Sequence, residues 1–263
     1  MSNFDSTKYG LAIHTTSPQL GLAISNFAND TRSQTWELGR DLSTHLHQYL
    51  IEFLQPQTWS DLAFIAVAKG PGSFTSTRIG LVTARTLAQQ LNIPLFSISS
   101  LAAFAWQTVR WGAGVDGGDE GDGGEQQFST FNFQLAIAKG KGFAEQTSLR
   151  QRLRQKPSYP PTLALQMPAR RGQLYTAIYQ VSSEGLGLTT LMPDAVVTPE
   201  IWQQALYELE KPYQLLDVPV NLGEYAPNLL QLAYLDWQQG KLPHWSEVLP
   251  FYGQHPVELK IVN

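Results

Sequence analysis

The chain has 263 residues, 43% of them hydrophobic, with a formal net charge of -4 and no cysteine. This length favours two lobes over one core. The negative charge argues against unaided binding of nucleic acid, and the lack of cysteine excludes disulfides, thiolate metal sites and cysteine nucleophiles. Met1–Lys8 is polar and no apolar run approaches the roughly 18 residues of a membrane span, so we expect a cytoplasmic protein.

The first third of the chain predicts one α/β lobe. Strands 9–13 and 21–25 are expected to pair across the polar turn 15–18, and a third strand is expected near 34–38. Apolar residues at helical spacing predict helices from about Asp41 to Pro56 and from about Thr75 to Leu91. The remaining expected elements are strands 63–68 and 93–98 and a helix 101–109 capped by Ser99 and Ser100.

The middle of the chain changes composition. From Gly112 to Gly124 it consists mostly of glycine and acidic residues, and a basic stretch and a proline-rich stretch follow. Such a segment cannot bury enough apolar surface to fold by itself. We therefore expect an N-terminal lobe at 1–111, a low-complexity insertion or linker at 112–161, to which 128–138 could add a strand, and a C-terminal lobe at 162–263.

The last third again begins with a strand, a tight turn and a strand. These are expected at 162–167, 168–172 and 174–179, followed by a strand near 188–191. A helix starts at Thr198-Pro199 and reaches about Leu209, a strand lies at 213–216, and a helix spans 227–239 before Gly240. The repeated opening indicates two lobes of related topology.

The loop between strand 63–68 and the next helix, Lys69-Gly70-Pro71-Gly72-Ser73-Phe74-Thr75, is rich in glycine and hydroxyls. It matches neither a P-loop, which needs a lysine, nor a dinucleotide fingerprint, which needs a third glycine. Two interpretations stay open: an anion site formed by Gly70, Gly72, Ser73 and Thr75, or helix capping and tight packing.

Three segments together resemble the TsaB (YeaZ) family: His14-Thr15-Thr16-Ser17 after the first strand, Gly70-Pro71-Gly72-Ser73-Phe74-Thr75 with Arg78-Ile79-Gly80, and Ala169-Arg170 with Gly172 and Tyr175. The resemblance implies a two-lobed α/β actin-like ATPase (ASKHA) fold, each lobe built on a ribonuclease H-like mixed sheet. It also implies a part in forming N6-threonylcarbamoyladenosine (t6A) at adenosine 37 of tRNAs that read ANN codons.

In that family the protein is a non-catalytic partner subunit of the catalytic TsaD, together with TsaE, and it contacts tRNA only through the complex. The resemblance also implies that two helices of the N-terminal lobe form one surface, used for a homodimer or, alternatively, for a heterodimer with TsaD. The residues expected on that surface are Leu46, Tyr49, Leu50, Phe53, Arg78, Leu81, Val82 and Arg85.

The sequence departs from the family at two positions where nucleotide chemistry would need an acidic side chain. The family usually has Asp where His14 stands, and the matching Asp of the second lobe is replaced by Pro168. Because Mg²⁺ prefers oxygen ligands, we expect no metal, no cofactor and no catalytic residue. The alternative function is a stand-alone small-molecule kinase of the same superfamily or a peptidase-like hydrolase.

Overall fold

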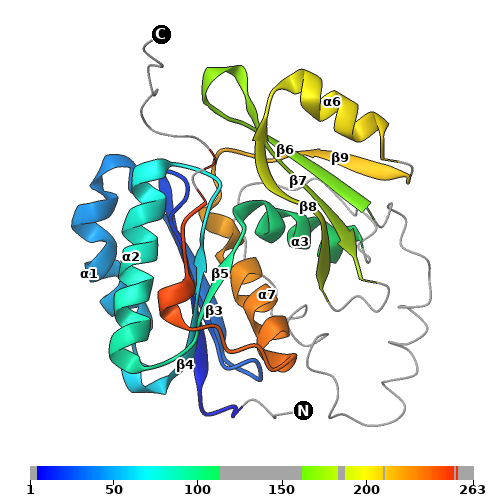
Figure 1. The fold of residues 1–263 in the computed structure, drawn as a ribbon. Coiled ribbons are helices and arrows are strands. Elements are labelled where there is room, and N and C mark those ends of the chain that lie inside the picture. Colours follow the sequence, from blue (N-terminus) through cyan, green and yellow to red (C-terminus); the bar gives the residue numbers. More distant parts are fainter. Residues whose placement is uncertain (1–4, 113–161, 183–186, 210, 252, 254–263) are drawn as a thin grey trace, which may run out of the picture.

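The computed structural model describes residues 5–112, 162–182, 187–209, 211–251 and 253. They form two mixed sheets with helices on both sides (Figure 1). The first sheet has the strand order β3-β2-β1-β4-β5 and the second β8-β7-β6-β9. The strands are β1 Tyr9–His14, β2 Gln19–Ser25, β3 Thr31–Glu37, β4 Leu62–Ala68, β5 Leu95–Ile98, β6 Thr162–Pro168, β7 Leu174–Val181, β8 Leu188–Val197 and β9 Tyr213–Asp217. The α-helices are α1 Leu42–Leu54, α2 Phe74–Leu91, α3 Ser100–Gly112, α6 Pro199–Tyr207 and α7 Ala226–Gln238.

The helices and sheets alternate in layers. Helices α1 and α2 cover the outer face of the first sheet, α3 and α7 lie between the two sheets, and α6 covers the outer face of the second (Figure 1). Strand β4 shows how the sequence makes this possible: Ile65 and Val67 enter the core under α1 and α2, whereas Phe64 and Ala66 enter the core that α3 and α7 share. Both faces of β4 are buried, so it is apolar throughout.

Helix α7 comes late in the chain but packs on the first sheet, where it contacts β1, β2 and β4. Its Tyr234 ring stacks on Phe27 with ring centroids 3.9 Å apart, and Leu230 lies over Gly10. The same core includes Leu163 and Tyr175 of the second sheet. One shared core therefore joins the two halves of the fold.

Most expected elements are confirmed, with differences at their ends. The strand predicted to stop at Leu191 extends to Val197 and includes Pro193. That prediction failed because β8 is an edge strand, where proline is tolerated since one side of the strand has no ladder partner. Helix α6 ends at Tyr207, not Leu209. Helix α3 extends to Gly112, beyond the predicted end at 109, and the rest of the predicted insertion or linker, 113–161 with 128–138, lies outside the described residues.

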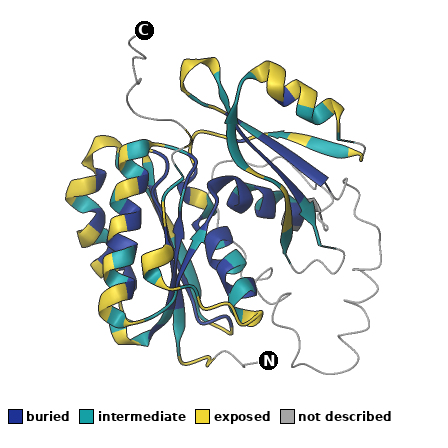
Figure 2. Cartoon of the chain, in the orientation of Figure 1, coloured by how far each residue is buried: buried dark blue, intermediate teal, exposed yellow. Residues whose placement is uncertain are grey.

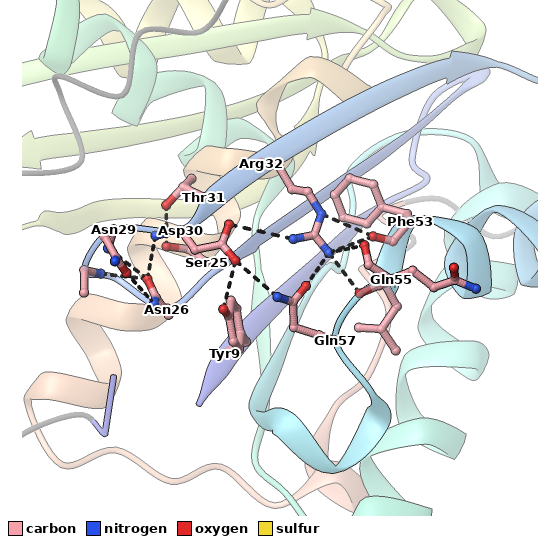
Figure 3. A network of polar contacts seen from close by, with 12 residues as sticks. Tyr9, Ser25, Asn26, Asn29, Asp30, Thr31, Arg32, Phe53, Gln55 and Gln57 are labelled. Carbon is pink, nitrogen blue, oxygen red and sulfur yellow. Dashed lines mark hydrogen bonds and ion pairs between the residues drawn. The ribbon is translucent and has the colours of Figure 1, made fainter. Parts of the chain in front are cut away.

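Arg32 on β3 fixes the C-terminal end of α1 (Figure 3). Its Nη2 donates to the carbonyl oxygens of Phe53, Leu54 and Gln55 at 3.0, 2.9 and 3.0 Å, and to Gln57 Oε1 at 2.6 Å. The last carbonyls of a helix have no partner within the helix, and a cation there also opposes the helix dipole favourably. Asp30 holds the guanidinium from the other side at 3.8 Å.

Replacing Arg32 by alanine leaves these carbonyls without their donor. We expect Arg32→Ala to lower the free energy of unfolding by about 1.5–3 kcal/mol, the range for hydrogen bonds to a charged group. Urea unfolding measures this, with Arg40→Ala, at an exposed position of the same lobe, as the matched control. Equal effects of the two substitutions would contradict the capping role.

Candidate functional site

The turn that follows β1 is buried and connects four parts of the molecule. His14, Thr15, Thr16 and Ser17 are each at most 1% exposed. Thr15 Oγ1 donates to the Ser76 carbonyl of α2 at 2.9 Å, and the Thr16 and Ser100 hydroxyls hydrogen-bond at 2.9 Å. Ser17 Oγ accepts from the Leu222 N–H at 3.1 Å, which brings in the segment before α7. Each buried hydroxyl is therefore satisfied by a different element.

The glycine loop packs directly against this turn. Gly70 and Gly72 have positive φ angles of +106° and +155°, and a Cβ at Gly72 would overlap Thr16. The Ser73 N–H donates to the Thr16 carbonyl at 2.7 Å, so this donor is not free for an anion. Ser73 Oγ accepts from Ser76 N at 3.5 Å and caps α2. The capping and packing interpretation thus holds for Ser73 and Gly72, and anion binding by Gly70, Gly72, Ser73 and Thr75 stays a prediction.

A cleft of about 520 Å³ lies between the glycine loop and the second sheet. Ser73 and Thr75 line one side, Pro168 to Arg171 line the other, and Phe251 closes it from the C-terminal segment. None of the described residues that line this cleft is Asp or Glu. An ASKHA nucleotide site needs carboxylates for its Mg²⁺, so the residues present here do not fit a magnesium nucleotide.

His14 occupies the strand end where the family has its first acid. The side chain is fully buried, and neither ring nitrogen has a hydrogen-bond partner in the described part of the chain. Burial without a counter-charge lowers the pKa of His14 to about 3. The imidazole is therefore neutral at pH 7, and His14 is not among the described residues that line the cleft.

Within the described ranges, no group of three or more His, Cys, Asp or Glu side chains is arranged to hold a metal ion. The predicted lack of a metal site remains a prediction. None of the helices in those ranges is both long and apolar enough to cross a membrane.

The structure corrects half of the expected partner surface. Leu46, Leu50, Phe53 and Leu81 are at most 7% exposed, because they form the row of α1 and α2 that packs on the first sheet. Their assignment to a surface was wrong, because apolar residues at helical spacing identify the side of a helix that packs on the sheet. Val82 and Arg78 are exposed, and Tyr49 and Arg85 are partly buried. Partner binding by these four stays a prediction.

Ile51 was not among the residues expected on this surface, yet it is 55% exposed, close to the 58% of Val82. Figure 2 shows the outer sides of α1 and α2 as exposed and their inner sides as buried. Ile51 follows the buried Leu50, and one residue turns a helix by about 100°, so the two cannot share a face. The sequence could have indicated the exposure of Ile51 through this one-residue offset from Leu50.

The chain matches a family model described as "TsaD: tRNA N6-adenosine threonylcarbamoyltransferase" over residues 41–119. It is 32% identical over 156 residues to the tRNA threonylcarbamoyladenosine biosynthesis protein TsaB of Bacillus subtilis, covering 59% of this chain and 46% of the relative. It is 40% identical over 70 residues to the TsaB of Buchnera aphidicola from Acyrthosiphon pisum, covering 26% and 32%. The chain thus spans less than half the length of these curated relatives.

Two solved structures from Pseudomonas aeruginosa share the fold. A protein described as similar to peptidase YeaZ has a TM-score of 0.63 at 19% identity, covering 94% of this chain and all of that one. A structure described as YeaZ has a TM-score of 0.62 at 19% identity, covering 93% and 99%.

Two mixed sheets with this helix arrangement define an α/β protein that shares its fold with the two YeaZ structures. In sequence the chain is similar to TsaB proteins and, over residues 41–119, to the TsaD-type family model.

The buried imidazole of His14 makes stability depend on pH. Its pKa is about 3 in the folded chain and about 6.5 when unfolded, so only the unfolded state gains this proton between those values. We expect this group to lower the free energy of unfolding by up to about 1.4 kcal/mol per pH unit as the pH falls from about 6.5 to about 3. Below about 3 both states carry the proton, so no further loss is expected.

His14→Phe removes both the titration and two unpaired buried nitrogens, so the variant should lose less stability on acidification than the parent chain. Urea unfolding of both proteins at pH 7, 6 and 5 provides the comparison. Identical pH slopes would show that His14 does not titrate on unfolding.

Proposed function

We propose that this chain takes part in forming t6A in tRNA as a non-catalytic subunit that binds a TsaD-type catalytic subunit and TsaE. Support comes from the TsaB relatives and from the TsaD-type model that matches residues 41–119. The non-catalytic part of the proposal is supported by the cleft, whose described lining lacks any carboxylate. The net charge of -4 favours contact with tRNA through a partner, not directly.

The observation that carries the binding role is the apolar surface of the two outer helices. Ile51 on α1 and Val82 on α2 are both more than half exposed, although their helices already bury a full row of apolar residues on the sheet. Contiguous exposed apolar surface marks interaction sites, whereas single exposed side chains do not, and the proposal takes Ile51 and Val82 to belong to one such surface. Because one surface can hold only one partner at a time, the homodimer and the complex with TsaD are alternatives.

The interface test replaces one apolar side chain by a charge. Ile51→Asp and Val82→Asp should each weaken binding to the TsaD subunit at least about tenfold, because a carboxylate would be desolvated in the interface. Both positions are exposed, so folding should be unaffected. Analytical ultracentrifugation of the mixed subunits measures complex formation. The same measurement on the chain alone detects the homodimer.

Ile201→Asp is the matched control, since Ile201 is 57% exposed on a helix of the other lobe. If all three variants assemble like the parent chain, the α1–α2 surface is not the interface. If Ile201→Asp is as damaging as the other two, the surface assignment is wrong as well.

Catalysis is tested on the isolated chain. Because the cleft offers no acidic ligand for Mg²⁺, we expect ATP hydrolysis with magnesium to stay at the rate of a buffer blank. In a reconstituted reaction with the other components, t6A formation should depend on adding the chain. Turnover by purified chain alone, in the absence of any complex, would refute the non-catalytic proposal and favour the kinase or hydrolase alternative.

A further inference from the structure

A second cavity, of about 380 Å³, lies where the end of the first sheet meets strand β8 of the second. It is separate from the cleft described above: Lys69, Ser99 and Asp194 line it, and none of them lines the cleft. Its volume is within the range of sites for small metabolites. The lining combines apolar side chains from α3 and α7, including Ala102, Leu232 and Leu235, with hydroxyl and charged groups.

Asp194 is held in this cavity by both halves of the fold. Its Oδ1 accepts from Ser99 Oγ at 2.8 Å, at the start of α3, and from the Tyr179 hydroxyl at 3.1 Å, on β7. Burial raises the pKa of the Asp194 carboxyl, and the Ser99 hydrogen bond and the charge of Lys69 act against that rise. These contacts occupy one carboxylate oxygen, and Oδ2 has no partner among the described residues.

Backbone hydrogen bonds fix the main chain of Lys69 on both sides. Its backbone N–H donates to the Ile98 carbonyl at 2.9 Å and its carbonyl accepts from the Phe251 N–H at 2.7 Å. In the described part of the chain its ammonium forms no hydrogen bond or ion pair, in contrast to Lys241 at the same cavity, which pairs with Asp236 at 2.6 Å. Lys69 and Asp194 influence each other electrostatically but make no direct ion pair.

We propose that this cavity binds a small zwitterion of the α-amino acid class, with its ammonium on Asp194 and its carboxylate on Lys69. Opposite charges in one small cavity that do not meet each other are each only partly compensated, and a ligand carrying both charges compensates both at once. A single anion would satisfy Lys69 alone and a single amine Asp194 alone. The apolar residues from α3 and α7 and the hydroxyls of Ser97, Thr189 and Thr190 remain for the ligand's side chain.

Binding is tested on the whole chain by isothermal titration calorimetry, with the twenty standard α-amino acids as separate probes at up to about 10 mM. Propylamine, propionate and inorganic phosphate serve as half-ligands, which carry only one of the two charges of an amino acid. We expect at least one amino acid to bind, and each half-ligand to bind at least about tenfold more weakly. No binding by any amino acid, or equal binding by a half-ligand, would overturn the proposal.

Two variants remove one charge each. Asp194→Asn keeps an amide oxygen that can accept from Ser99 and Tyr179, so the fold should persist, and Lys69→Met keeps the backbone contacts. Each should weaken amino acid binding at least about tenfold. Lys241→Met removes a lysine that is already paired at the same cavity and should bind like the parent chain. Parental affinity in both charge variants would overturn the proposal, and so would a loss in Lys241→Met as large as theirs.

Discussion

The structure depends on a buried polar turn, residues 14–17, in which each hydroxyl satisfies a partner from a different element. Thr15 reaches α2, Thr16 reaches α3 and Ser17 reaches the segment before α7. A buried hydroxyl without a partner costs more than its hydrogen bond contributes, so these contacts must form together. Close backbone approach makes them possible: a Cβ at Gly80 would overlap Thr15, and one at Gly21 would overlap Gly223. The turn thereby fixes where α2 begins and how the two sheets face each other.

The polar groups of this turn and of Ser73 in the glycine loop are largely used for contacts within the protein. The N–H of Ser73 is used by Thr16, its hydroxyl caps α2, and His14 is enclosed as a neutral ring. Phe251 crosses from the C-terminal segment to the carbonyl of Lys69. In this chain the described contacts of the loop therefore serve packing and helix capping.

Local signals in the sequence predict most of the fold because they are physical constraints on short segments. Short apolar runs predicted β1, β2 and β4, and Thr198-Pro199 predicted the start of α6, which the Thr198 side chain caps. The cavity beside β8 could not be predicted in this way, because only tertiary packing brings Lys69, Ser99, Tyr179 and Asp194 to the same place. The partner surface failed for a different reason. Leu46, Leu50 and Phe53 follow a correct helical stripe, but such a stripe identifies the face that packs on a sheet, whereas Ile51, on the exposed side of the same helix, lies outside it.

The segment from Lys69 to Val82 links the two proposals. Lys69 lines the zwitterion cavity, the glycine loop follows it, and α2 then carries Val82 to the outer surface of the lobe. Because Ser73 and Gly72 are packed against Thr16, the start of α2 cannot shift independently of this loop. Asp194 adds a second link, since it joins α3 and the second sheet through one carboxylate oxygen. A ligand that pairs with Lys69 and Asp194 would therefore restrain the same elements that position the partner surface. Any effect of such a ligand on partner binding must be matched by an equal effect of the partner on ligand affinity, since the two equilibria share one coupling free energy.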